Sequence, residues 1–135
     1  MMNYVKYGGK IFDITDQFLD LGLLDIKNIQ EVEGLSKLKE LRTLQLNANE
    51  ISRIKGLEKL KSLQVLNLGN NSMREIEGLS NLKNLEILHL VSNDIKDIKG
   101  LKALRNLKEL YLRGNAIEEI KGLERLTELR KLDRS

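Results

Sequence analysis

The chain has 135 residues, of which 41% are hydrophobic and 32% charged, a composition that supports one compact core and leaves too little length for two ordinary domains. The chain has 23 Lys and Arg against 20 Asp and Glu, and positive and negative side chains alternate along it. The sequence therefore has no basic stripe of the kind that would predict a nucleic-acid partner. The sequence has no cysteine, which excludes disulfides and thiolate metal sites.

The N-terminal end of the sequence carries no targeting or membrane signal. Residues 1–10 lack the apolar core of a signal peptide, and no apolar run approaches the roughly 20 residues that cross a bilayer. We therefore expect a cytoplasmic protein without membrane contact. A secretion signal removed upstream of Met1 is the alternative, because such a segment leaves no trace in the mature chain.

Residues 1–33 predict a cap over the repeats that follow. Within them, residues 4–7 and 10–13 are short apolar and aromatic segments on either side of Gly8 and Gly9, the pattern of a β-hairpin with a two-residue turn. Four of the five aromatic residues of the chain lie in this region. We expect them to form an apolar lid over the first repeat.

A short helix is predicted after the hairpin. Asp13 and Thr15 are both candidate N-caps, since their side-chain oxygens can accept hydrogen bonds from the first free amides of a helix. The helix is expected to continue through Leu21 and to end at Gly22, because glycine commonly follows a helix C-terminus.

The central part of the chain repeats itself every 22 residues. A fifth copy begins at Gly122 and stops, after four complete ones at 34–55, 56–77, 78–99 and 100–121. A fixed period of this length is the signature of stacked structural units, each of which buries the apolar face of its neighbour. We therefore divide the chain into an N-terminal cap at 1–33, four repeats at 34–121, and a partial fifth repeat or C-terminal cap at 122–135.

Half a repeat is also expected inside the N-terminal cap. Three apolar residues of the cap lie 22 positions before apolar residues of the first full copy, namely Leu24, Ile29 and Val32 before Leu46, Ile51 and Ile54. This match places the start of the repetitive structure between the predicted helix and residue 34.

Every copy follows the pattern L-x-x-L-x-L-x-x-N-x-I-x-x-I-x-G-L, with few exceptions. In the x-L-x-L part, a period of two predicts a short strand, with Leu44 and Leu46 directed into the core and their neighbours directed outward. Leu57, Leu60 and Leu63 recur every three residues, which favours a tight 3₁₀-like return over a long helix. The glycine that opens each return supplies freedom in φ.

An asparagine occupies the same register four times, at Asn49, Asn71, Asn93 and Asn115. The turn that leaves each strand carries backbone donors and acceptors that must be satisfied once they are buried, and an amide side chain offers both kinds of group. We expect these side chains to form a hydrogen-bonded ladder with a structural role.

This pattern resembles the leucine-rich repeat of the 22-residue class, as found in the leucine-rich regulatory subunit of protein phosphatase 1, in dynein light chain and in the bacterial internalins. The resemblance is close over residues 34–121 and loose in the flanks. It implies an α/β solenoid, a curved right-handed coil with a parallel β-sheet on its concave face and 3₁₀ or short helical returns on its convex face. It also implies a non-catalytic scaffold or regulatory subunit that binds a partner protein on the concave sheet.

The register predicts which side chains line the concave face, because they alternate with the inward leucines. They form three rows: Thr43, Val65, Ile87, Glu109 and Lys131; Gln45, Asn67, His89, Tyr111 and Asp133; and Asn47, Gly69, Val91 and Arg113. Apolar residues in these rows adjoin tyrosine and arginine, two types enriched at interface hot spots. The predicted partner-binding residues are Val65, Ile87, His89, Val91, Glu109, Tyr111 and Arg113.

The sequence does not favour catalysis. His89 is the only histidine, and Ser92 lies past the same strand in a turn, with no carboxylate placed to orient the imidazole. One histidine and scattered carboxylates also make a poor metal site, so we expect no metal and no cofactor.

A second hypothesis concerns the C-terminal end of the repeats. Leu132 takes the place of the first strand leucine of a fifth repeat, whereas Arg134 stands where the second leucine is expected. Either the polar residues end the stack, or the last strand edge stays open and pairs with another chain. The alternative function is therefore a structural element that self-assembles through open solenoid ends, or a part of a longer repeat protein.

Overall fold

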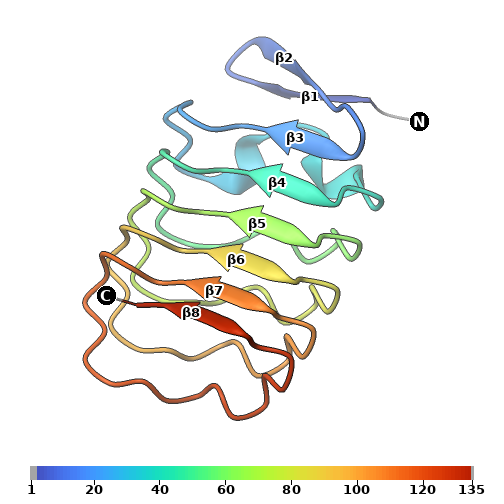
Figure 1. Ribbon diagram of the computed structural model, residues 1–135. Coiled ribbons are helices and arrows are strands. Elements are labelled where there is room, and N and C mark those ends of the chain that lie inside the picture. The colour runs from blue at the N-terminus through green and yellow to red at the C-terminus, as the bar shows by residue number, and fades with distance from the viewer. Residues whose placement is uncertain (1–2, 135) are drawn as a thin grey trace.

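Six short strands lie side by side in one parallel sheet (Figure 1). The computed structural model describes residues 3–134, so that Met1, Met2 and Ser135 of the predicted caps lie outside the described residues. The strands cross the sheet in chain order: β3 (Phe18–Asp20), β4 (Thr43–Gln45), β5 (Val65–Asn67), β6 (Ile87–His89), β7 (Glu109–Tyr111) and β8 (Lys131–Asp133). This arrangement confirms the predicted solenoid with a parallel sheet on one side.

The core lies between the sheet and the returns. Strands β4 to β7 each present one buried leucine between two half-buried residues that point the other way. These leucines pair across neighbouring strands and are 0% exposed: Leu44, Leu66, Leu88 and Leu110. A single coil cannot bury its own apolar face, so the stacking of coils supplies the stability.

The returns are tight turns. The amide of Leu60 donates to the carbonyl of Leu57 at 3.0 Å, and the amide of Leu63 donates to the carbonyl of Leu60 at 3.1 Å. These i to i+3 bonds are the 3₁₀ type that the three-residue spacing predicted. Two 3₁₀ helices, η1 (Ile29–Glu31) and η2 (Leu35–Lys37), lie in the first coil, and no helix within residues 3–134 is long and apolar enough to cross a membrane.

Glycine opens each return because two coils meet there. Gly78 has a φ of 70°, and a Cβ at this position would overlap the carbonyl oxygen of Ile54 in the preceding coil. Gly100, with a φ of 79°, meets the carbonyl of Ile76 in the same way. A side chain at either position would strain the backbone and push the two coils apart.

An antiparallel hairpin covers the N-terminal end of the stack (Figure 1). It consists of β1 (Tyr4–Tyr7) and β2 (Lys10–Asp13), joined as predicted by two glycines with positive φ. Val5 of β1 is 0% exposed and belongs to the core. Lys6 and Glu33 exchange two backbone hydrogen bonds of 3.1 and 2.9 Å, which attach the hairpin to the first coil.

The helix predicted from Asp13 or Thr15 to Leu21 is wrong. This segment contains β3, and Leu19 pairs with Leu44 of β4 in parallel register. Asp16 has a φ of 51°, which is incompatible with a right-handed helix at that point. The local capping signals are weak compared with the hydrogen bonds and leucine burial that the strand gains from β4.

The half repeat was predicted in the wrong register. The amide of Leu21 donates to the carbonyl of Gln45 at 2.8 Å, and the amide of Leu46 donates in the same way to the carbonyl of Asn67. The counterpart of Leu46 is therefore Leu21 and not Leu24. The spacing from Leu21 to Leu46 is 25 residues, against 22 in the later coils, so the first coil is longer by three residues. The extra length lies near η1 and brings Glu33 to the hairpin.

Candidate protein-binding face

The parallel register aligns the outward side chains of the six strands into two continuous rows, on what we call the sheet face. The first row is Phe18, Thr43, Val65, Ile87, Glu109 and Lys131, and the second is Asp20, Gln45, Asn67, His89, Tyr111 and Asp133. Neighbouring strands are about 4.8 Å apart, so adjacent side chains of one row can touch. The sheet face is therefore one continuous surface made from every coil.

All seven residues predicted to bind a partner lie along this surface. Five of them occupy the two rows on β5 to β7, namely Val65, Ile87, Glu109, His89 and Tyr111. Val91 and Arg113 follow β6 and β7 in a third row, in which their carbonyls accept hydrogen bonds from Asn70 at 2.7 Å and Ser92 at 2.8 Å. Their role in binding remains a prediction.

An aromatic pair lies in the C-terminal half of the second row. The rings of His89 and Tyr111 stack with centroids 4.3 Å apart and an angle of 13° between their planes. The Tyr111 hydroxyl donates to Glu109 Oε1 at 2.5 Å, and Lys131 Nζ lies 5.0 Å from the centre of the tyrosine ring. These contacts hold a flat aromatic surface in one orientation on the sheet face, which reduces the entropy lost when a partner packs on it.

Ion pairs surround this aromatic pair. Arg113 lies 3.2 Å from Asp133, and Arg130 lies 3.9 Å from Glu109. The side chain of Arg113 is 63% exposed, so much of its guanidinium stays open to a partner. The C-terminal half of the sheet face is thus polar and charged, whereas the first row of the N-terminal half is mainly apolar.

Burial controls the charge of His89. The imidazole is half-buried against its neighbours, and this burial lowers the pKa of His89 below its ordinary value of 6.5. Glu109 acts in the opposite direction and Lys131 in the same direction as burial. Burial thus favours the neutral imidazole, which stacks on Tyr111 without a charge to desolvate.

The sequence reasoning missed two members of the sheet face. Phe18 and Asp20 begin the first and second rows on β3, and Phe18 is 40% exposed instead of forming part of a lid. The signal that could have found them is the segment F-L-D-L-G at 18–22, which has the same leucine spacing as T-L-Q-L-N at 43–47. A search restricted to a period of 22 does not detect it.

The repeated asparagines hold the turns behind the strands. Asn93 Oδ1 accepts from the amide of Met73 at 3.0 Å, while its Nδ2 donates to the carbonyls of Leu68 at 3.0 Å and Leu90 at 3.1 Å. The same bonds to the preceding coil recur at Asn49, Asn71 and Asn115. Each amide ties its own turn to the coil before it and positions the strand ends.

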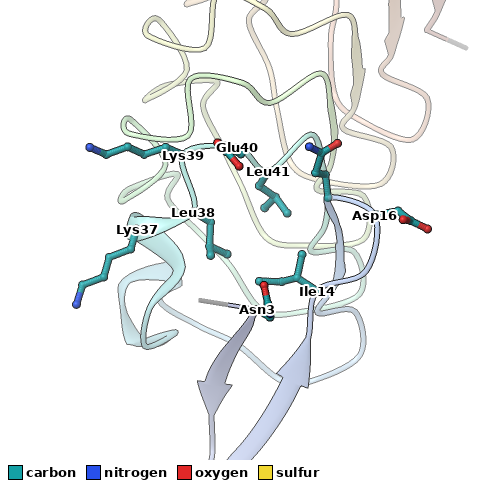
Figure 2. A pocket seen from close by; sticks show the side chains of 9 residues that line it. Asn3, Ile14, Asp16, Lys37, Leu38, Lys39, Glu40 and Leu41 are labelled. Carbon is teal, nitrogen blue, oxygen red and sulfur yellow. The ribbon is translucent and has the colours of Figure 1, made fainter. Parts of the chain in front are cut away.

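A depression of about 800 Å³ lies beside the segments that lead into β3 and β4, at residues 14–17 and 37–41 (Figure 2). Ile14, Leu38 and Leu41 form its apolar lining, and Figure 2 shows Lys37 and Lys39 extending away from it. Polar and charged residues also line the depression, namely Asn3, Asp16, Gln17, Lys37, Lys39 and Glu40. Within residues 3–134, no three His, Asp or Glu side chains are grouped to hold a metal.

Comparison with known proteins identifies the repeat. A family model described as leucine-rich repeats in two copies matches residues 61–103. Internalin C2 of Listeria monocytogenes is 34% identical with a TM-score of 0.78, over 86% of this chain and 50% of that chain. Internalin F of the same organism is 31% identical with a TM-score of 0.77, over 87% of this chain and 34% of that chain.

A more distant structure, that of a TLR13–ssRNA13 complex, is 26% identical with a TM-score of 0.73, over 96% of this chain and 18% of that chain. No match was found among curated proteins. The chain spans half the length of internalin C2 and smaller parts of the other two structures. The repeat pattern, the parallel stack of coils and these matches together show that the chain is a leucine-rich-repeat protein with repeats of the internalin type.

Proposed function

We propose that the chain is a non-catalytic binding module that holds a partner protein on its sheet face. The observation that carries this proposal is the alignment, on adjacent strands, of the apolar Val65 and Ile87 with the stacked pair His89 and Tyr111. Leucine-rich-repeat domains are typically protein-interaction modules, because a solenoid presents one extended surface. The sheet face is that surface here.

The composition of the sheet face supports a protein partner. Half-buried aliphatic residues exclude water at the centre of an interface, and charged residues at its edge orient the partner. Tyr111 and Arg113 belong to the residue types that contribute most to binding energy, and Tyr111 is already held in place by Glu109 and His89. The charges are paired across strands and form no basic stripe for phosphates.

Capture of partners from the source cell tests this proposal. Ile87→Lys places a cation beside Glu109, its neighbour in the first row, so the substitution removes an apolar contact while leaving the fold intact. Arg105→Glu is the matched control, because Arg105 is exposed on a return. The parent and control chains are expected to retain the same partner protein. The Ile87→Lys chain is expected to retain at least about tenfold less of this protein.

Two outcomes contradict the proposal. Equal capture of that protein by the parent and the Ile87→Lys chain would place the binding surface elsewhere. Capture that disappears after ribonuclease treatment would indicate a nucleic acid, the class of ligand named in the TLR13–ssRNA13 structure. Circular dichroism of all three chains confirms that the substitutions leave the fold unchanged.

A further inference from the structure

The first row of the sheet face begins with uncharged side chains on four adjacent strands, β3 to β6 (Figure 1). Phe18 is 40% exposed, and the residues that follow it in the row are half-buried, namely Thr43, Val65 and Ile87. We call these four residues the apolar strip. Three strand spacings of about 4.8 Å make the strip about 14 Å long. It ends at β7, where the charged Glu109 follows in the same row.

The spacing of the apolar strip matches the turns of an α-helix. A helix rises about 1.5 Å per residue, so that side chains at positions i, i+3, i+7 and i+10 lie on one face at about 0, 4.5, 10.5 and 15 Å. The four residues of the strip lie at about 0, 4.8, 9.6 and 14.4 Å. An extended peptide along the strip presents a side chain to it only about every 6.6 Å, and so falls out of step after the first contact. The strip therefore fits an amphipathic helix of about three turns that crosses the strands.

The width of the sheet face fits the same element. The first and second rows are two residues apart along each strand, a separation of about 6.6 Å. A helix with its side chains is about 10 Å wide, so a helix over the apolar strip also reaches the second row. There one flank of the helix meets the polar side chains of Asp20, Gln45 and Asn67. The helix is thus expected to be apolar on one face and polar on this flank.

The second row supplies one charge to this flank. Asp20 is the only Asp, Glu, Lys or Arg in the two rows of β3 to β6. Its Oδ1 accepts a hydrogen bond from the amide of Gly22 at 2.9 Å, and it forms no ion pair with any of residues 3–134. The carboxylate is therefore held in place and is free to pair with a cation.

We propose that the partner docks on the sheet face through an amphipathic α-helix of about three turns, whose apolar side chains lie along the apolar strip and whose Lys or Arg pairs with Asp20. This inference rests on the proposed function, because it names the element of the partner that the sheet face receives. Arg42 lies one residue before β4, on the side of the strip away from the second row, and is exposed. It favours an acidic residue on the opposite flank of the helix.

Selection from a phage-displayed library of random peptides of about 16 residues, enough for about four helical turns, tests the helix. Phages that bind the parent chain are kept, and those that also bind the Ile87→Lys chain are discarded, so that only binders of the sheet face remain. The enriched sequences are expected to carry apolar residues at i, i+3, i+7 and i+10, with Lys or Arg within one turn of an end of this pattern. Circular dichroism of the synthetic peptides is expected to show a gain of helix on binding.

The outcomes separate this inference from the proposed function. Binders of the sheet face whose apolar residues alternate with a period of two overturn the helix and leave the proposed function standing. Binders with the helical spacing but no basic residue overturn the pairing with Asp20 in the same way. A selection in which every binder also binds the Ile87→Lys chain counts against the sheet face itself, and so against both.

Asp20→Asn tests the ion pair with the enriched peptide. Asparagine can keep the hydrogen bond to the amide of Gly22, since Asn67 accepts from the amide of Gly69 at the same distance of 2.9 Å, so that only the charge is lost. The peptide is expected to bind the variant about two- to fivefold more weakly, as measured by fluorescence anisotropy. Asp97→Asn is the matched control, because Asp97 is exposed outside the sheet face, and it is expected to leave the affinity unchanged.

A second peptide, in which glutamine replaces the basic residue, isolates the pairing. This peptide is expected to bind the parent and Asp20→Asn chains equally, because it has no cation for Asp20. Weakening of both peptides to the same extent by Asp20→Asn, or of neither, overturns the pairing. Thermal unfolding of each variant verifies that the fold is kept.

Discussion

Replacing Asn93 with alanine tests the role of the asparagine ladder. Asn93 is 6% exposed, and its side-chain amide bonds to one backbone N–H, that of Met73, and to the backbone carbonyls of Leu68, Leu90 and Val91. Alanine leaves the amide of Met73 without a partner, and a buried unsatisfied group costs about 1–3 kcal/mol. The three carbonyls keep a second donor each, from Asn71, Asn115 and Asn70. Since each lost hydrogen bond contributes a further ~1 kcal/mol, we expect the free energy of unfolding to fall by about 2–4 kcal/mol, a substantial part of the ~5–15 kcal/mol typical of a folded domain.

Urea unfolding followed by circular dichroism measures this loss, with Asn106→Ala as the matched control. Asn106 makes one hydrogen bond of the same kind, to the carbonyl of Lys83 at 2.9 Å, but on the exposed surface. Its replacement is expected to cost about 1 kcal/mol or less, since water can take over the bond. Equal losses for the two variants would refute the reasoning, because burial of the ladder would then contribute nothing.

Three further perturbations follow from the same structure. In thermal unfolding, Gly78→Ala is expected to destabilise the chain by about 1 kcal/mol or more relative to Gly9→Ala. Both glycines have positive φ, but a Cβ meets the preceding coil only at Gly78, so equal effects of the two substitutions would contradict this expectation. Leu107→Ala is expected to lower the free energy of unfolding by about 2–5 kcal/mol, and Leu129→Ala by less, because only Leu107 is fully buried; urea titration of both variants decides. An NMR titration is expected to show a pKa of His89 below 6.5. The neutral form of His89 then contributes stability that is present above pH 6.5 and is lost as the pH falls through the lowered pKa. If the free energy of unfolding of the parent chain and of His89→Gln fell equally with decreasing pH, the shift would be absent.

Much of the molecule follows from the sequence because the repeat is local and periodic. The 22-residue period was enough to predict the parallel sheet, the inward leucines of β4 to β7, the tight returns and the rows of the sheet face. Each of these features depends on contacts with the same position of the next coil, so one correct register determines them all. The hairpin was predictable too, because two adjacent glycines between short strands favour a specific turn.

Tertiary structure decided what the period does not encode. The segment that contains β3 has local signals for a helix, yet it becomes a strand because pairing with β4 buries Leu19 and completes the sheet, a gain that is visible only across 25 residues of chain. Phe18 consequently joins the sheet face. The stacking of His89 on Tyr111 likewise depends on side-chain rotamers and on neighbours in adjacent coils. Local propensities are worth tenths of a kcal/mol per residue, whereas burial of one leucine contributes about 1.5–3 kcal/mol, so contacts between coils override the local preference.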